Sequence, residues 1–159
     1  MGKLCFMFGH SSAPGCILPE IENAVEYMYT EHGIRSFVVG RYGSFDHLAG
    51  RAVKNRKKAH SDISLSLLLP YHPALRPYTP SEGFDGTLYP EGRETVPPRF
   101  AIVKANQLMV KDADSVICYV KHPGNTEKLL QMAMIQKRKR GLMVYNIAES
   151  ICDYNVRHE

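Results

Sequence analysis

ADSVICYVKHPGNTEK, residues 113–128, is the stretch of sequence that decides the fold. Its first eight residues form a mostly apolar run typical of a buried strand, and residues 126–140 are predicted to form a helix. Between the two, Gly124 lets a ligand approach the backbone closely, and Asn125 or Thr126 can cap the helix. The unpaired N–H groups and the dipole at a helix start favour an anion. The stretch therefore predicts a site for a phosphate-bearing ligand.

The rest of the chain repeats this alternation of strand and helix. Apolar runs predict the strands, and periodic apolar positions with stop signals such as Gly33 predict the helices. The expected strands cover residues 4–8, 34–39, 63–69, 113–120 and 142–147, and the expected helices cover 18–32, 44–58, 99–111 and 126–140. The alternation predicts an α/β protein with a three-layer, Rossmann-like fold: a mostly parallel sheet of about five strands with helices on both faces. We expect one domain over residues 1–148 and a tail over 149–159.

Three loops that leave strand ends contain glycine and small polar residues. They cover residues 9–15, 40–44 and 123–126. In a parallel sheet such loops lie at one edge, where ligands bind, so their convergence carries more weight than any one loop, which alone also fits an ordinary turn. The predicted ligand-binding residues are Gly9, His10, Ser11, Gly40, Arg41, Gly43, Ser44, Tyr71, Gly124, Asn125 and Thr126.

Two charged residues near the second loop fit either a ligand contact or a structural role. The guanidinium fork of Arg41 suits a phosphate or a carboxylate, and a solvated arginine fits equally well. Asp46, like Ser44, can cap the second helix, and its alternative role is to accept hydrogen bonds from ribose hydroxyls. The sequence leaves these roles open.

The segment over residues 70–98 differs from the rest because it holds seven of the ten prolines. It cannot be a helix, and a short strand or turn is expected around residues 87–89. A loop of this length is typically functional or mobile, and Tyr71 and Tyr78 could close over a nucleobase as part of a lid. A surface flap packed on its own side chains and an oligomer contact are the alternatives.

Composition and charge limit the classes of function. The chain has 159 residues, is 44% hydrophobic and carries a net charge of +4, which favours one soluble domain that handles anionic small molecules over a nucleic-acid binder. No apolar run approaches ~18 residues and no leader precedes the first strand, so we expect no membrane partner. Four cysteines without a CxxC pair indicate reduced thiols and a cytoplasmic location. Seven histidines without paired ligand spacing indicate no metal site, and no cofactor is expected.

Five motifs in order resemble the SLOG superfamily, the Rossmann-like group that contains the Lonely Guy phosphoribohydrolases and DNA-processing protein A. They are Phe8-Gly9-His10, the glycine turn and aspartate over residues 40–46, Pro70 after the third strand, the segment over residues 106–114, and Gly124-Asn125-Thr126. The chain is most similar to the small single-domain branch of Firmicutes and their phages, over residues 4–147. The resemblance implies a nucleotide-like ligand. The third expected helix carries apolar residues that fit either the core or a dimer contact equally well, Ile102, Val103, Ala105 and Met109, and we expect a homo-oligomer, most simply a dimer.

The last motif departs from that of the Lonely Guy enzymes, which reads Pro-Gly-Gly-x-Gly-Thr-x-x-Glu. Here Asn125 replaces a glycine, and the glutamate position falls on Leu129. Glycosidic cleavage needs a placed carboxylate, and Glu127 and Asp46 are the candidate substitutes. We therefore expect a nucleotide sensor or binding module. The alternative is an enzyme, an N-glycosidic hydrolase or a deoxyribosyltransferase-like transferase, that acts on a nucleoside monophosphate or nucleoside.

Overall fold

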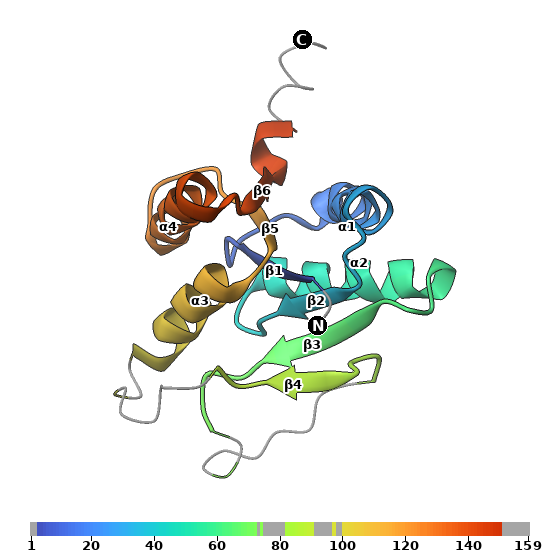
Figure 1. The fold of residues 1–159 in the computed structure, drawn as a ribbon, viewed down its shortest axis with the longest axis horizontal. Helices are drawn as coiled ribbons and strands as arrows, with labels where there is room; N and C mark the ends of the chain where they lie inside the picture. Colours follow the sequence, from blue (N-terminus) through green and yellow to red (C-terminus); the bar gives the residue numbers. More distant parts are fainter. Residues whose placement is uncertain (1–2, 73, 75–81, 91–96, 98–99, 151–159) are drawn as a thin grey trace.

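Six parallel strands form one sheet in the part of the chain that the computed structural model describes, residues 3–72, 74, 82–90, 97 and 100–150 (Figure 1). The strand order is β4-β3-β2-β1-β5-β6, and every neighbouring pair is parallel. The strands are β1 (Leu4–Gly9), β2 (Ser36–Val39), β3 (Ser64–Leu68), β4 (Gly86–Leu88), β5 (Ser115–Tyr119) and β6 (Met143–Asn146).

Helices cover both faces of this sheet, which confirms the predicted three-layer α/β fold. The helices are η1 (Gly15–Ile17), α1 (Leu18–His32), α2 (Ser44–Ala59), α3 (Ala101–Asp112) and α4 (Asn125–Arg140). Helices α1 and α2 pack on one face, and α3 and α4 pack on the other (Figure 1). Residues 147–150 are helical after β6, and the rest of the predicted tail lies outside the described residues.

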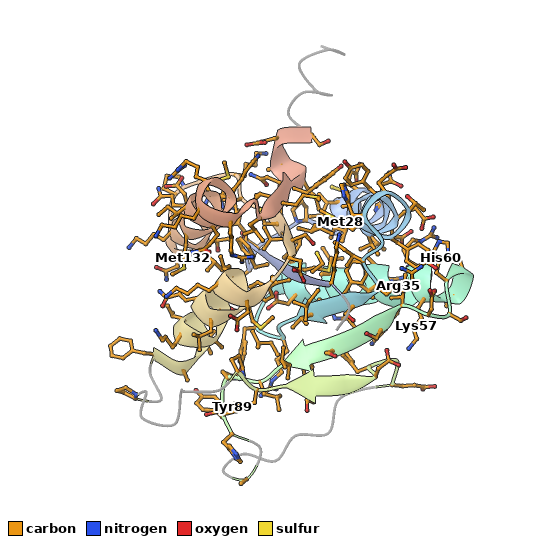
Figure 2. All side chains as sticks on the ribbon, viewed as in Figure 1. Met28, Arg35, Lys57, His60, Tyr89 and Met132 are labelled. Carbon is orange, nitrogen blue, oxygen red and sulfur yellow. The ribbon has the colours of Figure 1, made fainter. Side chains whose placement is uncertain are left out.

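The central strand β1 supports both helix layers because its side chains alternate between the two faces. Cys5 and Met7 are buried against α1 and α2, whereas Phe6 and Phe8 are buried against α3 and α4. Figure 2 shows side chains filling the space between the layers, and Met28 of α1 is fully buried there. Each large side chain buried in this way contributes about 1.5–3 kcal/mol.

The sequence predicts about five strands, and β4 is the sixth. The short strand or turn expected around residues 87–89 overlaps this strand. It pairs parallel with β3 at the sheet edge. Asp85 fixes it there: its N–H donates to the carbonyl of Leu65, and its carboxylate accepts the N–H of Leu65 and binds Lys57 of α2. The rest of the 70–98 segment is largely outside the described residues, including Tyr78.

Glycine residues begin and end the helices more often than the sequence indicated. Helix α1 ends at Gly33 with a left-handed φ of 66°, as predicted. The predicted N-caps are wrong: Gly43 caps α2 instead of Ser44 or Asp46, and Gly124 caps α4 instead of Asn125 or Thr126. Each of these helices therefore begins without a side-chain hydrogen bond to its first N–H groups.

Close packing fixes the end of β1 against the start of α2. A Cβ atom on Gly9 would lie 2.5 Å from Cγ of Phe45, whose ring is fully buried. No other residue can occupy this position without a shift of that ring. The absence of a side chain at Gly9 therefore sets how closely α2 approaches the sheet.

We expect Gly9→Ala to lower the free energy of unfolding by about 1–3 kcal/mol, because the added methyl group overpacks the core beside Phe45. Urea denaturation of the two proteins measures the difference. Gly15→Ala is the matched control, since a Cβ at Gly15 meets no atom within 4 Å, and its change should stay within about 0.5 kcal/mol. Equal effects of the two substitutions would show that the contact with Phe45 does not limit the fold.

Candidate functional site

The three glycine-containing loops lie at one edge of the sheet, where β1, β2 and β5 end. The first two loops contact each other directly: the N–H of Ser44 donates to the carbonyl of Ser11 at 3.0 Å, and its Oγ donates to the carbonyl of Ala13 at 2.6 Å. A Cβ on Gly43 would lie 2.7 Å from Cα of Ser11, so only glycine permits this approach. The parallel pairing thus produces the convergence that the alternation predicted.

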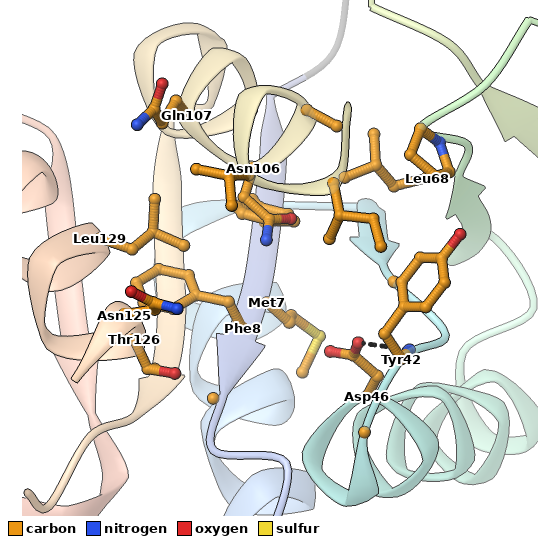
Figure 3. A pocket seen from close by; sticks show the side chains of 18 of the residues that line it. Met7, Phe8, Tyr42, Asp46, Leu68, Asn106, Gln107, Asn125, Thr126 and Leu129 are labelled. Atoms are coloured by element: carbon orange, nitrogen blue, oxygen red, sulfur yellow. Dashed lines mark hydrogen bonds between the residues drawn. The ribbon is translucent and has the colours of Figure 1, made fainter. Parts of the chain in front are cut away.

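A cavity of about 280 Å³ lies at this edge and extends under α3 and α4 (Figure 3). Apolar side chains from the sheet and both helices form much of its wall: Phe6, Phe8, Leu68, Ile102, Leu129 and Met132. Polar side chains occupy distinct places on the wall: Ser11, Asp46, Asn106, Asn125, Thr126 and Lys128. The site is therefore an apolar slot with a few separate polar groups, as small-molecule sites commonly are.

The predicted ligand-binding residues divide into two groups in the structure. Those that line the cavity are Gly9, Ser11, Gly40, Gly43, Asn125 and Thr126. Those that do not line it are His10, Arg41, Ser44, Tyr71 and Gly124. Of the two candidate carboxylates, Asp46 lines the cavity and Glu127 does not. The side chain of Arg41 is exposed, and its guanidinium carbon lies 5.2 Å from the ring centre of Tyr42.

The start of α4 presents unpaired backbone donors at the cavity. Lys128 is the first residue whose N–H bonds within the helix, to the carbonyl of Gly124 at 3.2 Å, and no side chain caps the helix. The N–H groups of Asn125, Thr126 and Glu127 are left without an intrahelical acceptor. Gly124 has a φ of 142°, which strongly favours glycine, and its Cα faces open space. This end of the helix suits an anion.

Asp46 extends from the first turn of α2 into the cavity wall. Its Oδ2 accepts the N–H of Tyr42 at 3.0 Å, and a Cβ on Gly40 would lie only 2.8 Å from that oxygen (Figure 3). Oδ1 has no hydrogen-bond partner among the described residues. Burial raises the pKa of Asp46 from 3.8 to about 6, although the N–H of Tyr42 favours the ionised form. At neutral pH this is an ionised carboxylate with one unused oxygen.

The cavity is also lined by Gln107, Lys128 and Asn106, which the sequence prediction did not include among the ligand-binding positions. Asn106 belongs to α3. Its side chain is half-buried, points into the cavity and has no hydrogen-bond partner among the described residues (Figure 3). A half-buried amide without a protein partner is a natural contact for a ligand. One signal in the sequence could have found it: Asn106 interrupts the apolar face formed by Ile102, Ala105 and Met109.

His10 joins the loops after β1 and β5 instead of lining the cavity. The ring is buried, Nε2 accepts the N–H of Lys121 at 2.8 Å, and the ring stacks on His122 with centroids 3.7 Å apart. Burial lowers the pKa of His10, and the neighbouring His122 adds to the effect. A neutral imidazole with its proton on Nδ1 fits these contacts. His10 therefore holds the backbone of the third loop in place.

Within the described ranges, no three His, Cys, Asp or Glu side chains are grouped so that they could hold a metal ion. The same residues include no helix that is both long and apolar enough to span a membrane. Comparison of the chain with models of protein families and with curated proteins finds no match. The cavity and its polar groups therefore provide the basis for assigning a function.

We expect Asp46→Asn to raise the free energy of unfolding at pH 7.5 by about 1–3 kcal/mol. The folded-state pKa of about 6 lies above the ordinary value of 3.8, so ionisation of Asp46 destabilises the folded protein as the pH rises through this range. The gain should therefore shrink as the pH falls and be small near pH 4. Thermal denaturation of both proteins at several pH values measures it.

Asp112→Asn is the matched control for this prediction, because Asp112 is exposed at the C-terminal end of α3. This control substitution should change the melting temperature little at every pH that is measured. A lower melting temperature for Asp46→Asn at pH 7.5, or a gain that does not depend on pH, would contradict the assignment of a buried, destabilising charge to Asp46.

Proposed function

We propose that this protein binds a nucleotide or nucleotide-derived phosphate ligand in the cavity at the carboxyl edge of its sheet, as a sensor or binding module. One observation carries the proposal: a single apolar cavity has the uncapped start of α4 on one side and Asp46 on another. A ligand with an anionic group and a separate set of hydrogen-bond donors is complementary to this arrangement.

The phosphate end of the ligand would lie at the start of α4. The free N–H groups of Asn125 and Thr126 and the helix dipole favour negative charge there, and Lys128 also lines the cavity. The carboxylate of Asp46 would repel a phosphate, so the phosphate would bind favourably only at the end of the cavity formed by the start of α4. This polarity supports one direction of binding.

The apolar part of the cavity would take the ring of the ligand. Leu68, Ile102 and Met132 supply apolar surface, and Tyr42 lines the cavity with 42% of its surface exposed. The volume of about 280 Å³ is close to the lower limit of ~300–1,000 Å³ for small-molecule sites. This size supports a mononucleotide in preference to a dinucleotide. Tyr71 does not line the cavity, so the proposal does not depend on it.

Membership of the SLOG superfamily, a homodimer and a cytoplasmic location complete the proposal. Val103 on α3 and Ile135 on α4 are 47% and 41% exposed, which supports contact between two copies, and sedimentation equilibrium would report the mass. Cys5 and Cys118 are free and buried, as in proteins of reducing compartments. Burial raises the pKa of Cys5 to about 12, so this thiol is unreactive.

Asn125→Asp tests the phosphate end. The added carboxylate suits the helix dipole and should leave stability unchanged or slightly higher, but it should weaken binding of AMP at least tenfold by repelling its phosphate. Isothermal titration of AMP and adenosine measures both affinities, after a thermal-shift screen of nucleotides, nicotinamide dinucleotides and ADP-ribose. Adenosine has no phosphate, so its affinity should change little.

Gln131→Glu is the matched control, because it makes the same change on an exposed position of α4 that does not line the cavity. It should bind AMP as the unchanged protein does. If AMP binds no more tightly than adenosine, or if Asn125→Asp leaves the affinity for AMP unchanged, the phosphate does not lie at the start of α4. If no ligand of the screen binds, the proposed function fails.

Cleavage or transfer of an N-glycosidic bond is the second candidate function, and the position of Asp46 favours it. An ionised carboxylate inside the cavity could stabilise an oxocarbenium-like centre or activate water, whereas Glu127 does not line the cavity. The raised pKa of Asp46, about 6, also suits proton transfer near neutral pH.

This candidate predicts release of free base from a nucleoside monophosphate, which chromatography of the reaction mixture would detect. Asp46→Asn should lower the rate at least a hundredfold, because the amide cannot act as a base or stabilise positive charge. Glu127→Gln should retain the activity. The absence of base release by the unchanged protein, or equal rates for Asp46→Asn, would rule out this mechanism.

A further inference from the structure

We propose that Asp46 recognises the sugar hydroxyls of the ligand, so that the site prefers ribonucleotides to 2′-deoxyribonucleotides. This inference rests on the proposed function, because it concerns one contact within the same cavity. It makes Asp46 a specificity-determining residue, whether or not the protein has an enzymatic activity.

The carboxylate of Asp46 is held in one orientation. The N–H of Tyr42 binds Oδ2 at 3.0 Å, and Gly40 lies so close to the same oxygen that a Cβ there would be 2.8 Å away. This leaves Oδ1 available to the cavity (Figure 3). An oriented acceptor loses little conformational entropy when a ligand binds, which is what selective recognition requires.

An ionised carboxylate can only accept hydrogen bonds, so it selects a donor group of the ligand. With a pKa of about 6, Asp46 is mostly ionised at neutral pH. The hydroxyls of a ribose are neutral donors that can both reach one carboxylate. A phosphate offers no donor when fully ionised, and its charge would be repelled.

The order of polar groups around the cavity places the sugar at Asp46. Figure 3 shows Asn125 and Thr126 on one side of the end of β1 and Asp46 on the other, with Asn106 on α3 facing both. In a nucleotide the sugar lies between the phosphate and the base. With the phosphate at the start of α4 and the base among the apolar residues around Asn106, the hydroxyls are left to face Asp46.

The experiment measures dissociation constants of the four ribonucleoside monophosphates and their 2′-deoxy counterparts by isothermal titration at pH 7.5. For the base that binds best, the ribonucleotide should bind roughly 10- to 100-fold more tightly than the deoxynucleotide, since one hydrogen bond to a charged acceptor is lost. In Asp46→Asn the affinities for the ribonucleotide and the deoxynucleotide should differ by less than about threefold. Most of the change should be a loss of affinity for the ribonucleotide. The preference should also weaken below pH 6, where Asp46 becomes protonated.

Asp112→Asn serves as the control variant and should keep the preference of the unchanged protein, because Asp112 is exposed and does not line the cavity. Equal binding of ribonucleotides and deoxynucleotides by the unchanged protein would overturn this inference and leave the proposed function intact. A preference that survives in Asp46→Asn would also overturn it. Failure of every nucleotide to bind would overturn both.

Discussion

Parallel pairing of β1 with β2 on one side and β5 on the other is the constraint on which the rest of the structure depends. Because the strands run in the same direction, each connection must return across the sheet, and the helices of these connections cover its two faces. All strand ends then meet at one edge. The chain passes from β1 to β2 on one side of β1 and later forms β5 on the other side. The loops that follow β1 and β5 therefore lead in opposite directions, and a crevice forms between them. The fold itself thus creates a place for a ligand before any polar side chain is considered.

The layers of the fold could be predicted from the sequence because strands buried on both faces must be apolar throughout. Strand β5 illustrates this signal, because all five of its residues are buried and four of them, residues 116–119, are hydrophobic. Strand β4 could not be predicted with the same certainty, since its position depends on Asp85, which bonds to Leu65 twenty residues earlier. The N-caps of α2 and α4 were predicted wrongly because Gly43 and Gly124 act as caps where propensity favours Ser, Asp or Asn.

The carboxylate of Asp46 lies in the cavity wall at a cost to the stability of the fold. The fold would be more stable with a neutral group there, because burial raises the pKa to about 6 and the ionised form predominates at neutral pH. Among the described residues, the N–H of Tyr42 is the one hydrogen-bond donor to this carboxylate. Groups whose pKa is strongly shifted by burial cluster at functional sites. The cost of Asp46 to the fold is therefore itself an argument that this wall of the cavity binds something.

The glycine pattern at the sheet edge indicated room for a ligand, but the protein uses much of that room itself. Gly9 makes space for an aromatic ring of α2, and Gly43 makes space for the loop after β1, whereas Gly124 faces open space. A glycine in a sequence marks a close approach without saying whether protein or ligand approaches. The loops therefore act mainly as a scaffold that sets the shape of the cavity. Among the side chains that line this cavity, Asp46 and Asn106 are the ones on which the proposed ligand contacts depend.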